Sequence, residues 1–174
     1  KYLNNMQKLI PDIIFIKRLL QVELKEDLRN IITDYLFTTV LNFTEEEFSK
    51  KLYMNEKNIK EMISEGMHIG CHGYNHYWWN QLSELELNHD LDLSLEFLNK
   101  VGVDLNNWTA CYPYGSYSNR VAEILKNKGC KVAFTTEVNV ADINRDHNLL
   151  LPRLYTNDLP KDRNTDINHW YKKG

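Results

Sequence analysis

The sequence predicts an α/β fold with a parallel sheet, because short apolar segments alternate with amphipathic helices over the second half of the chain. An apolar segment at residues 67–71 precedes a long helix at 83–101. A second one at 108–112 precedes a helix at 118–128, and a third follows at 131–135. Helices of about ten residues between strands are typical of βα units. The sheet is expected to be either open or closed into a barrel.

The region upstream of the first strand is predicted to be helical. Apolar residues recur at spacings of three and four over residues 11–37, which is the periodicity of an amphipathic helix. Thr44 and Glu47 have the form of a capping box and open a short helix, and Asn55 can cap another that ends at Gly66. A helical lead-in therefore precedes the first strand.

The second half of the chain has its own boundary signals. Ser83 and Glu86 form another capping box, and the helix that they open has a leucine stripe that ends before Gly102. Residues 149–155 have the pattern of a further strand, buried where it is apolar. We expect three regions: a helical insertion or lead-in at residues 1–43, an α/β domain at 44–160, and a peripheral tail at 161–174.

Composition limits the class of protein. With 174 residues and 43% hydrophobic content, the chain can bury a core of its own. Its 21 basic and 24 acidic residues give a net charge of −3, so no nucleic-acid partner is expected. No apolar run reaches the roughly 18–20 residues that span a bilayer, so we expect a soluble chain, either cytoplasmic or exported by an upstream signal. Three reduced thiols are expected, rather than one disulfide with a thiol left over, at Cys71, Cys111 and Cys130.

The most informative motif is His72-Gly73-Tyr74-Asn75-His76, directly after the first predicted strand. In parallel α/β folds, chemistry collects on loops at the carboxyl ends of strands. Two imidazoles four residues apart can converge on one divalent ion, and neutral imidazole suits zinc, cobalt, nickel or iron. The alternative is that both histidines are ordinary loop residues that satisfy nearby carbonyl groups.

Aromatic residues surround this motif. Tyr77, Trp78 and Trp79 follow it directly. Such rings commonly line carbohydrate sites, although at least one of the two tryptophans is expected to pack in the core. The next predicted strand ends in Tyr112-Pro113-Tyr114-Gly115, where the glycine allows close approach of the backbone. Main-chain N–H groups in this segment can stabilise an oxyanion, unless the segment is only a turn.

In this order, the motifs H-G-Y-N-H, Y-P-Y-G and Leu151-Pro152-Arg153 resemble the polysaccharide deacetylase family, also called the NodB-homology or carbohydrate esterase 4 family. The resemblance covers about residues 45–158. It implies a distorted (β/α) barrel that hydrolyses N-acetyl or O-acetyl groups of sugar polymers with a divalent metal, usually zinc. The implied partner is an acetylated polysaccharide or oligosaccharide.

The resemblance also implies roles for individual residues. His72 and His76 match the family's two metal-binding histidines, and Tyr114 matches the residue whose backbone N–H stabilises the tetrahedral oxyanion. Arg153 resembles the arginine that some members place beside the catalytic aspartate, where a guanidinium can orient a carboxylate and keep it ionised. The alternative for Arg153 is an ion pair at the rim of the fold. The residues expected to contact substrate are Trp79, Tyr112 and Pro113.

The chain departs from the family pattern at three motifs. The T-F-D-D-G motif, which supplies the general base and a third metal ligand, is not found, and Asp34 in a predicted helix is a poor substitute. We therefore expect a barrel that is incomplete at the N-terminus, with this motif upstream of residue 1. Cys111 stands where many members have the arginine of R-x-P-Y-G. The L-x-H motif of the general acid has no clear match in His147 or His169.

The resulting interpretation is a metal-dependent hydrolase of acetylated sugars. Because two neutral ligands leave an ion under-coordinated, the chain alone is expected to bind metal weakly and to show little deacetylase activity. One alternative is an inactive relative that binds glycan without hydrolysing it. Another is a structural domain whose histidines bind no metal.

Overall fold

The computed structural model describes residues 11–41, 44–160, 162 and 169–172. The chain divides into two compact units, Lys1–Met54 and Asn55–Gly174. The sheet and the predicted site residues all belong to the second unit. Among the helices of the described ranges, none is long and apolar enough to cross a membrane.

The first unit is helical, as predicted, but its first helix is interrupted. Residues 11–18 are helical and continue into the π-helix η1 (Leu19–Glu23), after which α2 (Glu26–Val40) begins anew. The prediction of one helix over residues 11–37 is therefore wrong at Leu24 and Lys25, where the backbone is extended. Two acidic residues in the first turn of α2, Glu26 and Asp27, favour a helix start there by complementing the helix dipole.

The cap of the next helix is confirmed. In α3 (Glu45–Leu52), the Thr44 hydroxyl accepts a hydrogen bond from the Glu47 N–H, and the Glu47 carboxylate accepts one from the Thr44 N–H. Each side chain thus satisfies a backbone donor that the helix start would otherwise leave unpaired.

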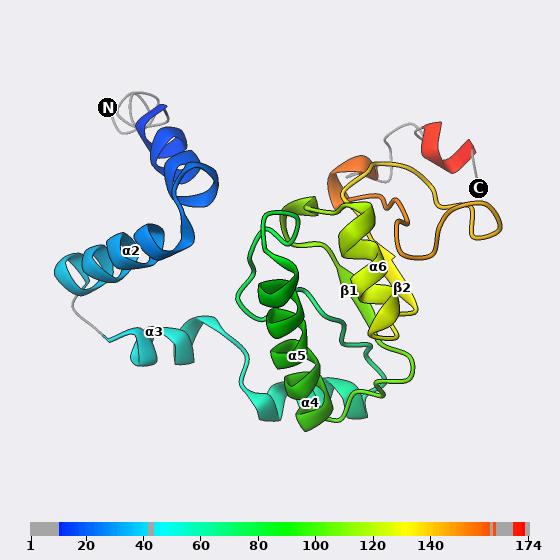
Figure 1. The fold of residues 1–174 in the computed structure, drawn as a ribbon, viewed down its shortest axis with the longest axis horizontal. Helices are drawn as coiled ribbons and strands as arrows, with labels where there is room; N and C mark the ends of the chain where they lie inside the picture. Colours follow the sequence, from blue (N-terminus) through cyan, green and yellow to red (C-terminus); the bar gives the residue numbers. More distant parts are fainter. Residues whose placement is uncertain (1–10, 42–43, 161, 163–168, 173–174) are drawn as a thin grey trace. The chain divides into compact units, whose positions relative to one another are not determined.

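The second unit alternates helices with two short strands (Figure 1). Three of its helices begin at side-chain caps: Asn55, Ser83 and Ser118 each accept a hydrogen bond from a backbone N–H three residues on. In chain order the elements are α4 (Glu56–Ser64), α5 (Glu84–Val101), β1 (Thr109–Cys111), η2 (Pro113–Gly115), α6 (Asn119–Asn127), β2 (Val132–Phe134), η3 (Thr156–Asp158) and η4 (His169–Lys172).

The sheet is parallel, as predicted, and extends beyond its two strands by single bridges. Strands β1 and β2 pair in register, with Ala110 opposite Ala133. Cys71 bridges Ala110 on one side, and Leu151 bridges Phe134 on the other, also in parallel. The order across the sheet is therefore the Cys71 segment, β1, β2 and the Leu151 segment.

The two outer strands are shorter than predicted. At residues 67–71, the Met67 N–H bonds to the Met62 carbonyl and completes the end of α4, so that only Cys71 pairs with β1. At residues 149–155, only Leu151 forms a bridge to β2. Beyond it, the Arg153 N–H donates to the Glu137 carbonyl, which lies outside β2. The α/β class is confirmed. The sheet is not closed within the described residues, so no barrel is observed there.

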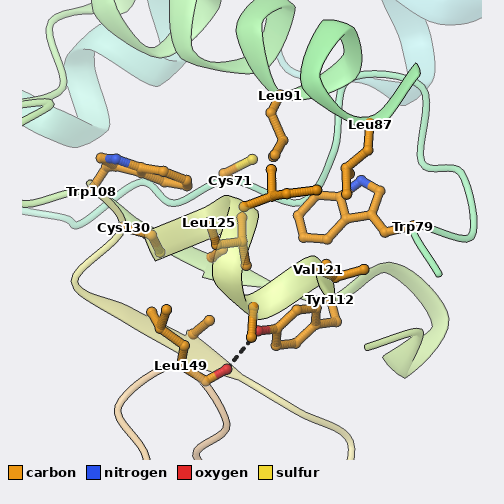
Figure 2. Packing of buried hydrophobic residues seen from close by; sticks show 14 of the residues in the cluster. Cys71, Trp79, Leu87, Leu91, Trp108, Tyr112, Val121, Leu125, Cys130 and Leu149 are labelled. Atoms are coloured by element: carbon orange, nitrogen blue, oxygen red, sulfur yellow. Dashed lines mark hydrogen bonds between the residues drawn. The ribbon is translucent and has the colours of Figure 1, made fainter. Parts of the chain in front are cut away.

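One core joins the sheet to its helices (Figure 2). The leucine stripe of α5 buries Leu87, Leu91 and Leu98, and α6 contributes Val121 and Leu125. Small residues in the middle of both strands, Ala110 and Ala133, are almost completely buried in this core. All three cysteines are free, as expected.

Because side chains alternate along a strand, the other face of the sheet carries different residues. Thr109, Cys111 and Phe134 line a cleft of about 390 Å³, and His72 and Arg153 lie along the same cleft. The sheet therefore separates an apolar core from an open cleft, along which His72 and Arg153 lie.

We expect the protein to lose stability at alkaline pH, because its core buries a thiol and a phenolic hydroxyl that can lose a proton there. Burial raises the pKa of the Cys130 thiol to about 12 from its ordinary 9.0, and burial also raises the pKa of the Tyr112 hydroxyl. Both groups are held neutral in the folded state. Their contribution to the free energy of unfolding is therefore fully present below the pKa that each group has in the unfolded chain. It is lost as the pH rises through the pKa of the folded state. We expect the free energy of unfolding to fall between about pH 9 and about pH 12.

Denaturant unfolding at a series of pH values measures this slope. Cys130→Ala removes one of the titrating groups and should make the decline shallower than in the wild type. A Cys130→Ala protein with an unchanged alkaline slope would contradict the assignment to this thiol.

Candidate active site

The histidine loop begins where the Cys71 segment leaves the sheet. Gly73 and His76 both have positive φ angles, 77° and 57°. Glycine adopts this region freely, and histidine is among the residues that tolerate it. Two residues of this five-residue motif have a left-handed backbone conformation, which allows the chain to turn back. The side chains of His72 and His76 therefore face each other.

The two imidazole rings meet at their Nε2 atoms. His72 Nδ1 donates a hydrogen bond to the Cys111 carbonyl over 2.8 Å. Because a carbonyl can only accept, the proton lies on Nδ1, and the Nε2 atom of neutral His72 acts as an acceptor. It is within hydrogen-bond distance of His76 Nε2, at 3.1 Å, and the ring centroids are 4.7 Å apart.

This separation fits two ligands of one metal ion. Two Zn–N bonds of about 2.0–2.1 Å, at angles between octahedral and tetrahedral, place their nitrogens roughly 2.9–3.4 Å apart. The observed 3.1 Å lies within this range. Within the described ranges, no group of three or more His, Cys, Asp or Glu side chains could hold a metal. Of the described residues, any metal bound here would therefore have only the two histidines as ligands.

The Y-P-Y-G segment forms a tight turn beside the histidines. Tyr114 has φ 55° and ψ 11°, a left-handed conformation that is unusual for a tyrosine. The Gly115 N–H donates to the Tyr112 carbonyl and the Ser116 N–H to the Pro113 carbonyl, both over 2.9 Å. The Tyr114 N–H has no such partner among the described residues. In the described part of the chain, the turn thus leaves the Tyr114 N–H without a backbone acceptor.

Aromatic contacts connect this turn to the histidine loop. The Trp78 ring stacks on Tyr114 with centroids 4.6 Å apart and an interplanar angle of 5°. Tyr114 also meets His76 edge-on, with ring centroids 4.5 Å apart. Tyr114 therefore contacts both Trp78 and His76, a proposed metal ligand. The sequence singled out the run of three aromatics but gave no means of telling which of them reaches Tyr114.

The residues predicted to contact substrate are in the core instead. Trp79, Tyr112 and Pro113 are all fully buried. The Trp79 indole N–H donates to Asp90 over 3.1 Å. The Tyr112 hydroxyl donates to the Leu149 carbonyl over 2.6 Å, as Figure 2 shows. A side chain without exposed surface cannot stack on a sugar, so the structure corrects this assignment. The expectation that at least one tryptophan packs in the core is confirmed.

Arg153 lies in the cleft rather than in a rim ion pair. Its Nη1 donates to Cys111 Sγ over 3.7 Å, and its guanidinium lies 5.0 Å from the centre of the Tyr155 ring. Its Nε is buried and has no hydrogen-bond partner among the described residues. No described carboxylate forms a salt bridge with it. A buried donor of this kind is suited to an acceptor such as a carboxylate.

His147 and His169, the two histidines considered for the general acid, have partners outside the pair. His147 Nδ1 accepts a hydrogen bond from the Leu149 N–H, and His169 packs on Trp170. Asp90 is the residue that sequence reasoning missed: it is buried, and it accepts four hydrogen bonds from the histidine loop and Trp79. Its position three residues after Leu87, on the buried face of α5, was the available signal.

One solved structure with a similar fold is a deacetylase. A Streptococcus pyogenes deacetylase, PplD, in complex with acetate matches with a TM-score of 0.56 and 26% identity, over 62% of this chain and 47% of that one. IcaB from Ammonifex degensii matches with a TM-score of 0.48 and 26% identity, over 59% of this chain and 47% of the other. The chain thus spans about half the length of these proteins.

No curated protein sequence matches the chain at a significant level. The sequence profile of one family, described as polysaccharide deacetylase, matches residues 31–133. This segment is more than half of the chain and includes the histidine pair and the Tyr114 turn. The chain therefore belongs to the polysaccharide deacetylase family.

Proposed function

We propose that this chain provides two metal ligands and the oxyanion donor of an enzyme that removes acetyl groups from a sugar polymer. The observation that supports this most directly is the convergence of the His72 and His76 Nε2 atoms, 3.1 Å apart, beside the Tyr114 turn. Family membership supports the reaction class. The acetate bound to the S. pyogenes deacetylase is what such a reaction would release.

The proposed metal is a divalent ion, with zinc as the first choice because both donors are imidazole nitrogens. Such an ion polarises the acetyl carbonyl and lowers the pKa of a bound water. His72 is oriented for this role by the Cys111 carbonyl, which fixes its tautomer and ring direction. The Tyr114 N–H would then donate to the oxygen of the tetrahedral state, where its charge is greatest.

Arg153 has a supporting role in this proposal. Its unpartnered Nε lies in the cleft that His72 also lines. A fixed guanidinium there can orient a carboxylate and keep it ionised, as a general base requires. No described carboxylate occupies this position, so the proposed base belongs to a part of the enzyme outside the described residues.

We infer further that the four-segment sheet is a portion of the family's distorted (β/α) barrel. The face of the sheet that carries the open cleft would then be part of the barrel interior. In barrels of this type the reacting groups lie at the carboxyl ends of the strands. His72 follows Cys71 and Tyr114 follows β1, which agrees with this placement. The proposed substrate is an acetylated polysaccharide or oligosaccharide.

The proposal predicts weak zinc binding and little acetate release by the chain alone, because two neutral ligands leave the ion under-coordinated. Calorimetric titration with zinc measures the first, and an acetate assay on oligomers of N-acetylglucosamine or O-acetylated sugars measures the second. A polypeptide that also carries a family T-F-D-D-G segment should release acetate in a zinc-dependent manner. No acetate release by that polypeptide from any such sugar would contradict the proposed function.

A further inference from the structure

A buried carboxylate on α5 holds the loop between the two histidines. Asp90 is 2% exposed, and both of its oxygens are fully used. Oδ1 accepts from the backbone N–H and the side-chain amide of Asn75, over 2.9 and 3.0 Å. Oδ2 accepts from the Tyr74 N–H over 3.2 Å and from the Trp79 indole over 3.1 Å. Three of the four donors thus lie between His72 and His76 in the sequence.

The loop is shaped around this carboxylate. A Cβ at Gly73 would lie 3.1 Å from Asp90 Oδ2, 3.1 Å from the Trp79 indole nitrogen and 3.3 Å from Pro113. The absence of a side chain at Gly73 therefore allows the carboxylate and the indole to approach the loop backbone. The end of the loop is held separately, because Arg120 of α6 donates to the Leu82 carbonyl over 2.7 Å.

Burial of a carboxylate is costly unless hydrogen bonds compensate for it. Asp90 could anchor a loop anywhere in the fold, but these bonds fix residues 74 and 75, which set the distance between the two imidazoles. His76 itself has a positive φ angle, so its ring direction depends on how the preceding residues are held. The contacts therefore relate Asp90 to the geometry of the histidine pair.

We propose that Asp90 is the positioning residue of the metal site: by holding the backbone of Tyr74 and Asn75, it keeps the His72 and His76 Nε2 atoms at metal-binding distance. This inference rests on the proposed function for its metal. Partners that orient metal ligands typically contribute about 10- to 100-fold to metal affinity.

Asp90→Asn is the direct test. The amide keeps the shape of the carboxylate, but whichever way it is turned, its NH₂ group faces either the two Asn75 donors or Tyr74 and Trp79. Two hydrogen bonds are lost in either orientation. Asp92→Asn is the matched control: it lies on the same helix and removes the same charge, but Asp92 is exposed and pairs with Lys128.

Two measurements are made on the full chain of each variant. Zinc titration should give a Kd about 10- to 100-fold higher for Asp90→Asn than for Asp92→Asn. Amide hydrogen exchange in the metal-free proteins should be faster at Tyr74 and Asn75 in Asp90→Asn, with the amides in the middle of α5 unchanged. If Asp90→Asn does not fold, Asn75→Ala removes one bond from an exposed loop position and should show both effects at smaller size.

The outcomes separate this inference from the proposed function. A zinc Kd within about twofold of the control, even with a lower melting temperature, would mean that Asp90 is only structural and would overturn the inference. If the wild-type chain binds no zinc, the proposed function fails. The exchange rates then decide alone whether Asp90 holds the loop, and unchanged rates at residues 74 and 75 overturn it.

Discussion

Alanine at both His72 and His76 should abolish zinc binding by the chain. The two Nε2 atoms, 3.1 Å apart, are the proposed metal donors, and the described residues contain no larger cluster of such donors. Loss of ligands should exceed the roughly 10- to 100-fold decrease in affinity that changes around a metal site cause. Elemental analysis after dialysis against excess zinc, together with calorimetric titration, measures the effect.

His68→Ala is the matched control for this experiment. His68 is an exposed histidine that lines the same cleft, but its Nε2 lies 2.8 Å from the Thr109 hydroxyl and is not part of the pair. Its removal should leave the zinc content close to that of the wild type. A double variant at His72 and His76 with unchanged zinc content would refute the metal site, and equal losses in all variants would indicate non-specific binding.

Much of the fold could be predicted because its signals are local. A cap involves residues only three positions apart, and capping boxes form at Thr44, Asn55 and Ser83. The positions of β1 and β2 followed from short apolar segments between helices. The ends of the outer strands could not be predicted in this way. They depend on where the partner strand lies, and a short stretch of sequence does not contain that information.

The candidate site shows the same division between local and long-range information. The spacing of His72 and His76 and the P-Y-G turn are local, and the structure brings them together through the Tyr114 ring. The choice between Trp78 and Trp79 is different. Trp79 turns into the core because the Asp90 carboxylate, eleven residues away, accepts a hydrogen bond from its indole N–H there. Trp78 is left to stack on Tyr114.

Gly115→Ala should destabilise the second unit strongly and disturb the proposed oxyanion donor. Gly115 has φ 70°, and an added Cβ would lie 2.2 Å from Thr136 Oγ1, 2.7 Å from its Cγ2 and 3.0 Å from its Cβ. A left-handed alanine costs about 1–2 kcal/mol, and overpacking adds about 1–3 kcal/mol. Rotation of the Thr136 side chain cannot relieve the contact with its Cβ, so the backbone of the turn must move. We expect a loss of about 2–5 kcal/mol in unfolding free energy.

Gly66→Ala separates the steric effect from the conformational one. Gly66 has a comparable φ of 84°, but no atom lies within 4 Å of an added Cβ, so only the backbone cost applies. Denaturant unfolding of both variants should therefore show a larger loss for Gly115→Ala. The Tyr114 N–H directly precedes the displaced residue. In a polypeptide that carries the T-F-D-D-G segment, Gly115→Ala should therefore also lower acetate release, measured at temperatures where the variant is still folded. Equal unfolding free energies for the two variants would mean that the turn yields without cost, and the fixed geometry proposed for the Tyr114 donor would then be wrong.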